Sequence, residues 1–284
     1  MTRLQSDDIS GIAPRLKAYD EELLAKTGCN LRQIVCHAVA FEEEAAREIT
    51  PRIRVGVVPI RWGQGVIEGF CEATAGILEH LGFNSFVVGQ SDIAGLAEAY
   101  ERKVDAVFLS DDNDFVALNA ETRQYVHNAD ATGKGFAAGL DLMTKGLADQ
   151  KVLVLGCGAV GRSVTSALLG YGAKVCVYDI YPPISQEFIS TIAGPHSDRL
   201  TIAPDFHEAL AGHSLIVDAT NAAEILHAQD ISPQTIIAAP GMPLGLSRDA
   251  LNKVSDRLLH DPLQIGVATM GMAVVRQLSQ IDRK

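Results

Sequence analysis

The sequence predicts a two-domain α/β protein whose C-terminal part is a doubly wound parallel sheet. Three observations lead to this fold class. The chain has 284 residues, 47% of them hydrophobic, and at about 100–200 residues per domain this is enough for two cores. From Arg54 onward, short apolar strands alternate with helical segments. One strand, at 151–155, runs directly into a Gly-x-Gly-x-x-Gly turn that is followed by a helix.

Two helices are predicted at the start of the chain. The first spans 6–27, with Ser6 as its cap, two aspartates in its first turn and Gly28 after its last residue. Asn30 is expected to cap the second, which runs into the acidic stretch 42–44. We interpret that stretch as a solvated face.

The next segment is predicted to form a small parallel sheet, because its strands are separated by helices that can act as crossovers. The expected strands are 55–60, 85–88 and 105–109, and the expected helices are 65–80 and 94–101. With the leading helices, this sheet forms a smaller N-terminal domain, residues 1–133. A helical stretch at 134–147 then leads into the second domain, residues 134–284.

The second domain is predicted to continue as strand and helix in turn after the glycine turn. The further strands are 174–178, 200–202, 214–220, 235–239 and 257–260, and the helices are 162–169, one from about 184, and 265–281. This alternation is typical of a Rossmann domain.

The glycine turn predicts a dinucleotide site. Gly156 permits the tight turn, Gly158 allows the backbone to approach a pyrophosphate, and Gly161 allows close packing of helix on strand. Backbone N–H groups around Ala159-Val160 would face the anion. Asp179 follows the next strand, where a carboxylate accepts hydrogen bonds from ribose hydroxyls and repels a 2′-phosphate, so NAD is favoured over NADP.

Other residues just past the strands are candidates for cofactor contact, because ligands gather at the carboxyl ends of parallel strands. Thr220 and Asn221 follow one strand, and Pro240 follows the next. We expect them to border the two riboses, although ordinary turn chemistry explains each of them taken alone.

An acidic cluster follows the strand that ends at Leu109. Asp111, Asp112 and Asp114 lie within four residues, and partial burial would raise the pKa of one of them toward neutrality. That would make a general base, with the choice between Asp111 and Asp112 open. Two alternatives remain: a solvated loop that caps a helix beginning at Phe115, or a Mg²⁺ site.

A second candidate loop follows the first strand and contains Ile60, Trp62, Gly63 and Gln64. Its glycines would bring backbone N–H groups forward at a helix start, where they could bind a carboxylate or phosphate of a substrate. A plain turn between strand and helix is the alternative.

The composition limits the partners and the compartment. A net charge of −11 without a basic run argues against nucleic acid and against an anionic membrane surface. The absence of a signal core and of an apolar stretch of about 20 residues predicts a cytoplasmic protein. The cysteines, Cys29, Cys36, Cys71, Cys157 and Cys176, lack Cys-x-x-Cys spacing, which predicts reduced thiols and no metal site.

Beyond these patterns, several motifs resemble the PylD family, the dehydrogenases that complete pyrrolysine biosynthesis. They are 55–60, 63–67, 83–87, 109–112 with Phe115 and Asn119, 240–243 and 262–266. The resemblance covers nearly the whole chain, and the motifs of the first half are more specific than the glycine fingerprint.

The resemblance implies an NAD-dependent oxidation of lysine-Nε-3-methylornithine, the amide of lysine with 3-methylornithine. The terminal amine would become an imine, water would replace ammonia, and the α-amine would close the pyrroline ring. Asp111 matches the family's proposed acid/base, Leu4 and the first helix match a segment that closes over the substrate, and the 61–64 loop and Asp261 match its pocket. Arg61 and Trp62 are bulkier than the family pattern, and Asp261 stands where a longer Glu can occur.

Two other classes of protein are alternatives to this one. A dehydrogenase of the shikimate or methylene-tetrahydrofolate type usually has a catalytic Lys in its substrate domain, whereas no Lys follows a strand of the first sheet here. A dinucleotide-sensing module would have no use for acidic residues near the nicotinamide. The expected partner is a small-molecule substrate, and a homodimer is left open beside a monomer.

Overall fold

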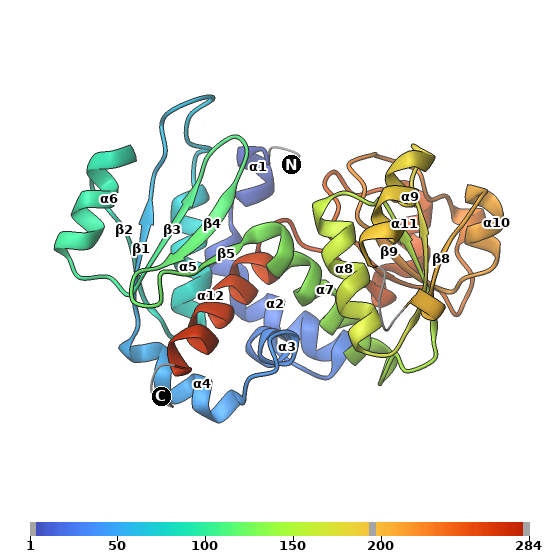
Figure 1. Cartoon of the computed structure of the whole chain (residues 1–284), viewed down its shortest axis with the longest axis horizontal. Helices are drawn as coiled ribbons and strands as arrows, with labels where there is room; N and C mark the ends of the chain where they lie inside the picture. Colours follow the sequence, from blue (N-terminus) through green and yellow to red (C-terminus); the bar gives the residue numbers. More distant parts are fainter. Residues whose placement is uncertain (1–3, 193–196, 281–284) are drawn as a thin grey trace.

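The computed structural model describes residues 4–192 and 197–280, which form two sheets surrounded by helices (Figure 1). The first sheet has strand order β2-β1-β3-β4-β5, and the second has strand order β11-β10-β9-β6-β7-β8. The predicted two-part α/β architecture is therefore present. No helix of the described residues is long and apolar enough to cross a bilayer.

The leading helices differ from the prediction, because each of the two predicted helices is divided into two. They are α1 (Ser6–Ile9), α2 (Ile12–Thr27), α3 (Leu31–Ala38), α4 (Glu43–Ile49) and a 3₁₀ turn, η1 (Thr50–Arg52). The predicted single helix over 6–27 is wrong, because Gly11 has φ +84° and breaks it, and the cap is Gln5 rather than Ser6. Asn30 caps α3 as predicted, since its Oδ1 accepts the Gln33 N–H at 3.0 Å.

The first sheet is mixed rather than parallel throughout. Its elements are β1 (Arg54–Val58), α5 (Phe70–His80), β2 (Asn84–Val87), α6 (Asp92–Glu101), β3 (Ala106–Ser110), β4 (Phe115–Asn119) and β5 (Tyr125–His127). β1 pairs in parallel with β2 and β3, but β4 is antiparallel to β3. The alternative of a helix beginning at Phe115 is thus wrong, because this segment is the strand β4. Every second residue of it is buried, namely Phe115, Ala117 and Asn119, as in a strand with one face toward the core. The acidic cluster consequently forms the turn of a β3–β4 hairpin.

The second sheet is parallel throughout. Its elements are β6 (Lys151–Leu155), α8 (Ala159–Gly170), β7 (Lys174–Tyr178), α9 (Pro182–Thr191), η2 (Ser197–Arg199), β8 (Leu200–Ile202), α10 (Phe206–Ala211), β9 (Leu215–Asp218), η3 (Ala228–Asp230), β10 (Ile236–Ala238), α11 (Arg248–Val254), η4 (Ser255–Arg257) and β11 (Leu258–Leu259). The strand order reverses between β6 and β9, where ligands bind in such sheets.

Two long helices connect the sheets: α7 (Asn128–Thr144) and α12 (Gln264–Ser279). Although α12 ends the chain, it packs against α7, α3 and α5 and against β4 and β5 of the first sheet, so the red helix in Figure 1 lies among blue and green elements. The division at 133/134 stays a prediction. The predicted end of the last helix, Ile281, lies outside the described residues.

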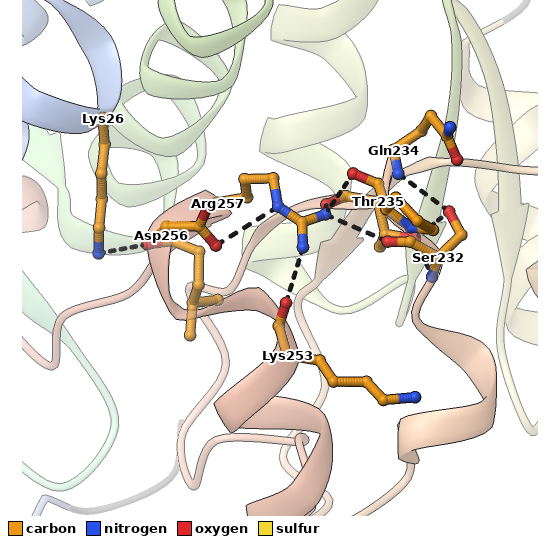
Figure 2. Close-up of polar contacts among 9 residues, drawn as sticks. Lys26, Ser232, Gln234, Thr235, Lys253, Asp256 and Arg257 are labelled. Atoms are coloured by element: carbon orange, nitrogen blue, oxygen red, sulfur yellow. Dashed lines mark hydrogen bonds and ion pairs between the residues drawn. The ribbon is translucent and has the colours of Figure 1, made fainter.

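Hydrogen bonds at one edge of the second sheet hold β11 in place, as Figure 2 shows. The Arg257 guanidinium donates to the carbonyl oxygens of Ser232, Pro233 and Thr235 and to that of Lys253. From α2, Lys26 Nζ donates to the Leu258 carbonyl at 2.7 Å. The leading helix α2 therefore covers the edge strand of the second sheet.

Candidate active site

A continuous cavity of about 1290 Å³ lies at the carboxyl ends of the strands of both sheets. This is larger than the roughly 300–1,000 Å³ of an ordinary small-molecule pocket, which leaves room for a cofactor and a substrate together. The predicted site residues that line it are Leu4, Ile60, Trp62, Gln64, Asp111, Gly156, Gly158, Ala159, Val160, Asp179, Thr220, Asn221, Pro240 and Asp261. Gly63 and Gly161 are not among its lining residues.

The glycine turn has the geometry that a dinucleotide site requires. Gly156 has φ +89°, and its N–H donates to the Tyr178 carbonyl at 2.8 Å. Apart from Gly158 and its two chain neighbours, no atom of the described residues lies within 4 Å of where a Cβ of Gly158 would stand. A Cβ on Gly161 would lie 1.9 Å from the Gly156 carbonyl oxygen, so only glycine lets α8 approach this closely. The turn and the first residues of α8 therefore fit the pyrophosphate of NAD.

Asp179 ties the end of β7 to the glycine turn. Its Oδ2 accepts the Cys157 N–H at 2.8 Å, and its Oδ1 accepts the Tyr181 N–H at 2.9 Å. The carboxyl group lines the cavity at the position predicted for the ribose contact. Beyond it, Ile180, Tyr181 and Phe206 give this end of the cavity apolar walls suited to an adenine ring.

Asp218 was not predicted as a site residue, although it ends a fully apolar strand. Its side chain is completely buried at the end of β9, and Oδ1 accepts hydrogen bonds from the Thr220 N–H and hydroxyl at 3.1 and 2.7 Å. Burial raises the pKa of Asp218 above its usual value. Because its own carbonyl accepts the Gly241 N–H at 2.9 Å, Asp218 holds together the loops that carry Thr220 and Pro240.

Asp111 opens the turn between β3 and β4 and is exposed. Its Oδ1 accepts the N–H groups of Asn113 and Asp114, each at 2.8 Å. These hydrogen bonds favour the ionised carboxylate and lower the pKa of Asp111. The expectation that crowding would raise a pKa in this cluster is therefore wrong for Asp111, because the turn remains solvated.

The other two acidic residues connect the turn to neighbouring elements. Asp112 Oδ2 accepts the Gln64 N–H at 2.9 Å from the loop after β1. Gly63 is needed for this contact, since a Cβ there would lie 2.2 Å from Asp112 Oδ2. Asp114 Oδ1 lies 2.8 Å from His127 Nε2, and His127 Nδ1 accepts a backbone N–H at the start of α7.

The Mg²⁺ alternative receives no support within the part of the chain that the structure describes. There, no group of three or more His, Cys, Asp or Glu side chains is arranged to hold a metal ion. The three aspartates of the turn instead face Asn113, Gln64 and His127.

Asp261 is the buried carboxyl group of the cavity, with 5% of its surface exposed. It lies before α12, where Oδ1 accepts the N–H groups of Leu263 and Ile265 at 3.0 and 3.2 Å. Oδ2 accepts the hydroxyl of Tyr19 on α2 at 2.5 Å. Burial raises the pKa of Asp261, and it also raises that of Tyr19.

The charges of the cavity share one sign. Among the described residues that line it, none is Lys or Arg. The acidic ones are Asp111, Asp112, Asp114, Asp179, Asp230 and Asp261. Such a cavity favours a substrate that carries positive charge.

Comparisons with known proteins agree with this geometry. Residues 8–126 match the N-terminal domain of pyrrolysine biosynthesis protein PylD. A curated pyrrolysine synthase of Methanosarcina acetivorans is 30% identical over 95% of this chain and 98% of its own length. The chain belongs to the pyrrolysine synthase (PylD) family. The pyrrolysine synthase of Methanosarcina barkeri is 28% identical over 97% of this chain and 98% of that protein.

The remaining matches concern the dehydrogenase fold. Residues 115–199 match the NAD binding domain of D-isomer specific 2-hydroxyacid dehydrogenases. The crystal structure of shikimate dehydrogenase from Aquifex aeolicus superposes with a TM-score of 0.55 at 18% identity, covering 79% of this chain and 91% of that one. This likeness concerns the fold alone. The family resemblance, the Rossmann fold and NAD as cofactor are thus confirmed, with a dehydrogenase role in pyrrolysine biosynthesis.

Proposed function

We propose that this member of the pyrrolysine synthase family oxidises the terminal primary amine of lysine-Nε-3-methylornithine with NAD and closes the pyrroline ring. The observation that carries this proposal is the charge of the cavity, whose described lining has carboxyl groups but no Lys or Arg. A hydroxy acid is purely anionic and would meet no cationic partner here, which is costly in a partly closed site, whereas the amide carries one carboxylate but more than one ammonium group. An amine substrate gains from the same surroundings.

Residues of the second sheet would hold the cofactor. The turn of Gly156 and Gly158 with Ala159 and Val160 would bind the pyrophosphate, and Asp179 the adenosine ribose. The nicotinamide side would be bordered by Thr220, Asn221 and Pro240. Hydrogen bonds to Asp218 join the loops that carry these residues. When bound, NAD supplies the acceptor for the hydride.

Asp111 would take the proton that the substrate ammonium must lose. A primary amine with a pKa of about 10 is protonated near neutral pH, and its nitrogen needs a free lone pair before the adjacent carbon can release a hydride. Its hydrogen bonds keep the Asp111 carboxylate ionised, but the lowered pKa also makes it a weak base, so it would pass the proton on to solvent and not retain it. Water would then add to the imine, ammonia would leave, and the α-amine would attack the aldehyde with loss of water.

The substrate side would be formed by the first domain. Leu4 and Ile60 supply apolar walls, and the loop of Trp62, Gly63 and Gln64 is joined to the acidic turn through Asp112. Asp261 adds a buried carboxyl group beside α12. Such walls would limit bulk water around the flexible intermediate and hold it for ring closure. A homodimer and a cytoplasmic location stay predictions.

The test is direct. Purified protein is incubated with NAD and the lysine–methylornithine amide while NADH absorbance and product mass are followed. We expect NADH formation and a product that is lighter than the substrate by ammonia and two hydrogen atoms, because the water that adds to the imine is released again at ring closure. NADH formation from shikimate or a hydroxy acid, with none from the amide, would contradict the proposal and favour the other dehydrogenase class.

A further inference from the structure

The loop between β1 and α5 carries Trp62, which is the one tryptophan in the sequence. Its side chain is 85% exposed and yet belongs to the lining of the cavity. In Figure 1 this loop rises beside the β3–β4 hairpin, at the end of the first sheet where the cavity opens. An indole at this place lies at the mouth of the cavity and remains accessible to an incoming molecule.

The backbone around Trp62 is held from two directions. Asp92 Oδ1 accepts the N–H groups of Arg61 and Trp62 at 2.9 and 3.2 Å. On the other side, Asp112 Oδ2 accepts the Gln64 N–H at 2.9 Å. The pKa of Asp92 is lowered, first by the Arg61 N–H, so the ionised carboxylate is the form that anchors the loop. The backbone that carries the indole is therefore held by specific contacts on both sides.

The surroundings of Trp62 favour a cation. The acidic turn lies beside the loop, and none of the described lining residues is Lys or Arg. An aromatic face attracts an ammonium group, and nearby carboxylates add to that attraction. Ile60, Ile67 and Phe70 also line the cavity and supply apolar surface that could cover a chain of methylene groups.

We propose that Trp62 determines specificity by binding the ammonium group at the lysine end of the substrate through a cation–π contact. This inference rests on the proposed function, in which the amine to be oxidised enters toward the cofactor. The long amide then brings the ammonium group at its other end, the lysine α-amine, outward to the mouth. Trp62 thus recognises a group that takes no part in the reaction and places the reacting amine by holding the opposite end.

The contact is tested by comparing wild type and one variant on two substrates. Wild type and Trp62→Leu are each assayed for kcat/KM with the lysine amide and with the corresponding amide of 6-aminohexanoic acid, which lacks only the α-amine. With the lysine amide, we expect Trp62→Leu to lower kcat/KM by about threefold to thirtyfold, mainly because KM rises. With the amide of 6-aminohexanoic acid, we expect kcat/KM to stay nearly unchanged. Trp62→Phe, which keeps an aromatic face, should fall between. An equal loss with both substrates would mean a simple apolar contact, and no loss would remove the role altogether.

A binding measurement separates this inference from the proposed function. Because the chain has a single tryptophan, fluorescence excited at a wavelength that its six tyrosines do not absorb reports on Trp62 alone. We expect saturable quenching when the lysine amide is added without cofactor, and a weaker response to the analogue without the α-amine. If the wild type forms NADH from the amide while its fluorescence and the variant's kcat/KM stay unchanged, this inference fails and the proposed function stands. If no NADH forms, the proposed function fails.

Discussion

The hydroxyl of Tyr19 donates to Asp261 Oδ2 at 2.5 Å, across 242 residues of sequence. Tyr19 belongs to α2 and Asp261 to the segment before α12, so this bond ties the leading helix to the start of the last one. Seven residues further along α2, Lys26 holds the carbonyl of Leu258. Asp261 lines the cavity, and Leu258 lies three residues before it on β11, so α2 supports the segment that carries this carboxyl group.

Tyr19→Phe should destabilise the protein, because it leaves a buried carboxyl oxygen with only the long hydrogen bond from the Ile265 N–H at 3.4 Å. We expect a loss of about 1–3 kcal/mol in the free energy of unfolding, measured with urea. Tyr100→Phe is the matched control, because Tyr100 is 56% exposed on α6 and its hydroxyl meets water. Equal effects of the two substitutions would show that the Tyr19 bond contributes nothing.

Asp218 should make stability depend on pH in a defined direction. Its pKa is raised by burial, so between about pH 4 and that raised pKa the folded state binds more protons than the unfolded state. The contribution of Asp218 to stability is therefore present at low pH and is lost as pH rises through the raised pKa. The amide side chain of Asp218→Asn keeps an oxygen that can accept the hydrogen bonds from Thr220, but it does not titrate.

The measurement compares the free energy of unfolding of wild type and Asp218→Asn from pH 4 to pH 8. We expect the wild type to lose stability relative to the variant as pH rises. The opposite trend would mean that the hydrogen bonds from Thr220 outweigh desolvation and stabilise the ionised form.

Asp111→Asn should abolish most turnover while leaving NADH affinity nearly unchanged. The amide oxygen can still accept the N–H groups of the turn, so the backbone is preserved and only the proton acceptor is lost. We expect kcat to fall by about 10²–10⁴-fold. Asp112→Asn is the control, since its amide can still accept the Gln64 N–H. A large loss in Asp112→Asn with none in Asp111→Asn would assign the base to Asp112.

Gly161→Ala should disrupt the cofactor site. A Cβ there would lie 1.9 Å from the Gly156 carbonyl oxygen, so α8 would have to move away from the glycine turn. We expect a loss of about 1–3 kcal/mol in stability and a marked loss of NADH affinity, measured by fluorescence titration. Gly170→Ala, at the other end of α8, has no atom within 4 Å of the new Cβ and should keep both properties. A Gly161→Ala variant that binds NADH like the wild type would contradict this reading of the turn.

The cofactor site could be predicted from the sequence because its requirements are local. The positive φ of Gly156 and the lack of space at Gly161 concern backbone within one strand, turn and helix, where only glycine fits. The strands β7 and β8 have the predicted bounds for a similar reason, since their apolar runs are short and bounded by turn residues.

The substrate side depends on contacts between distant segments, which local patterns do not encode. Phe115 could begin a helix or a strand until pairing with β3 determined its conformation. The pKa of Asp111 falls because two N–H groups of its own turn face it, whereas that of Asp261 rises because α2 and α12 exclude water from it. A carboxyl group's solvation and hydrogen-bond donors come from the folded chain, so its sequence neighbours alone could identify the candidate but not its protonation.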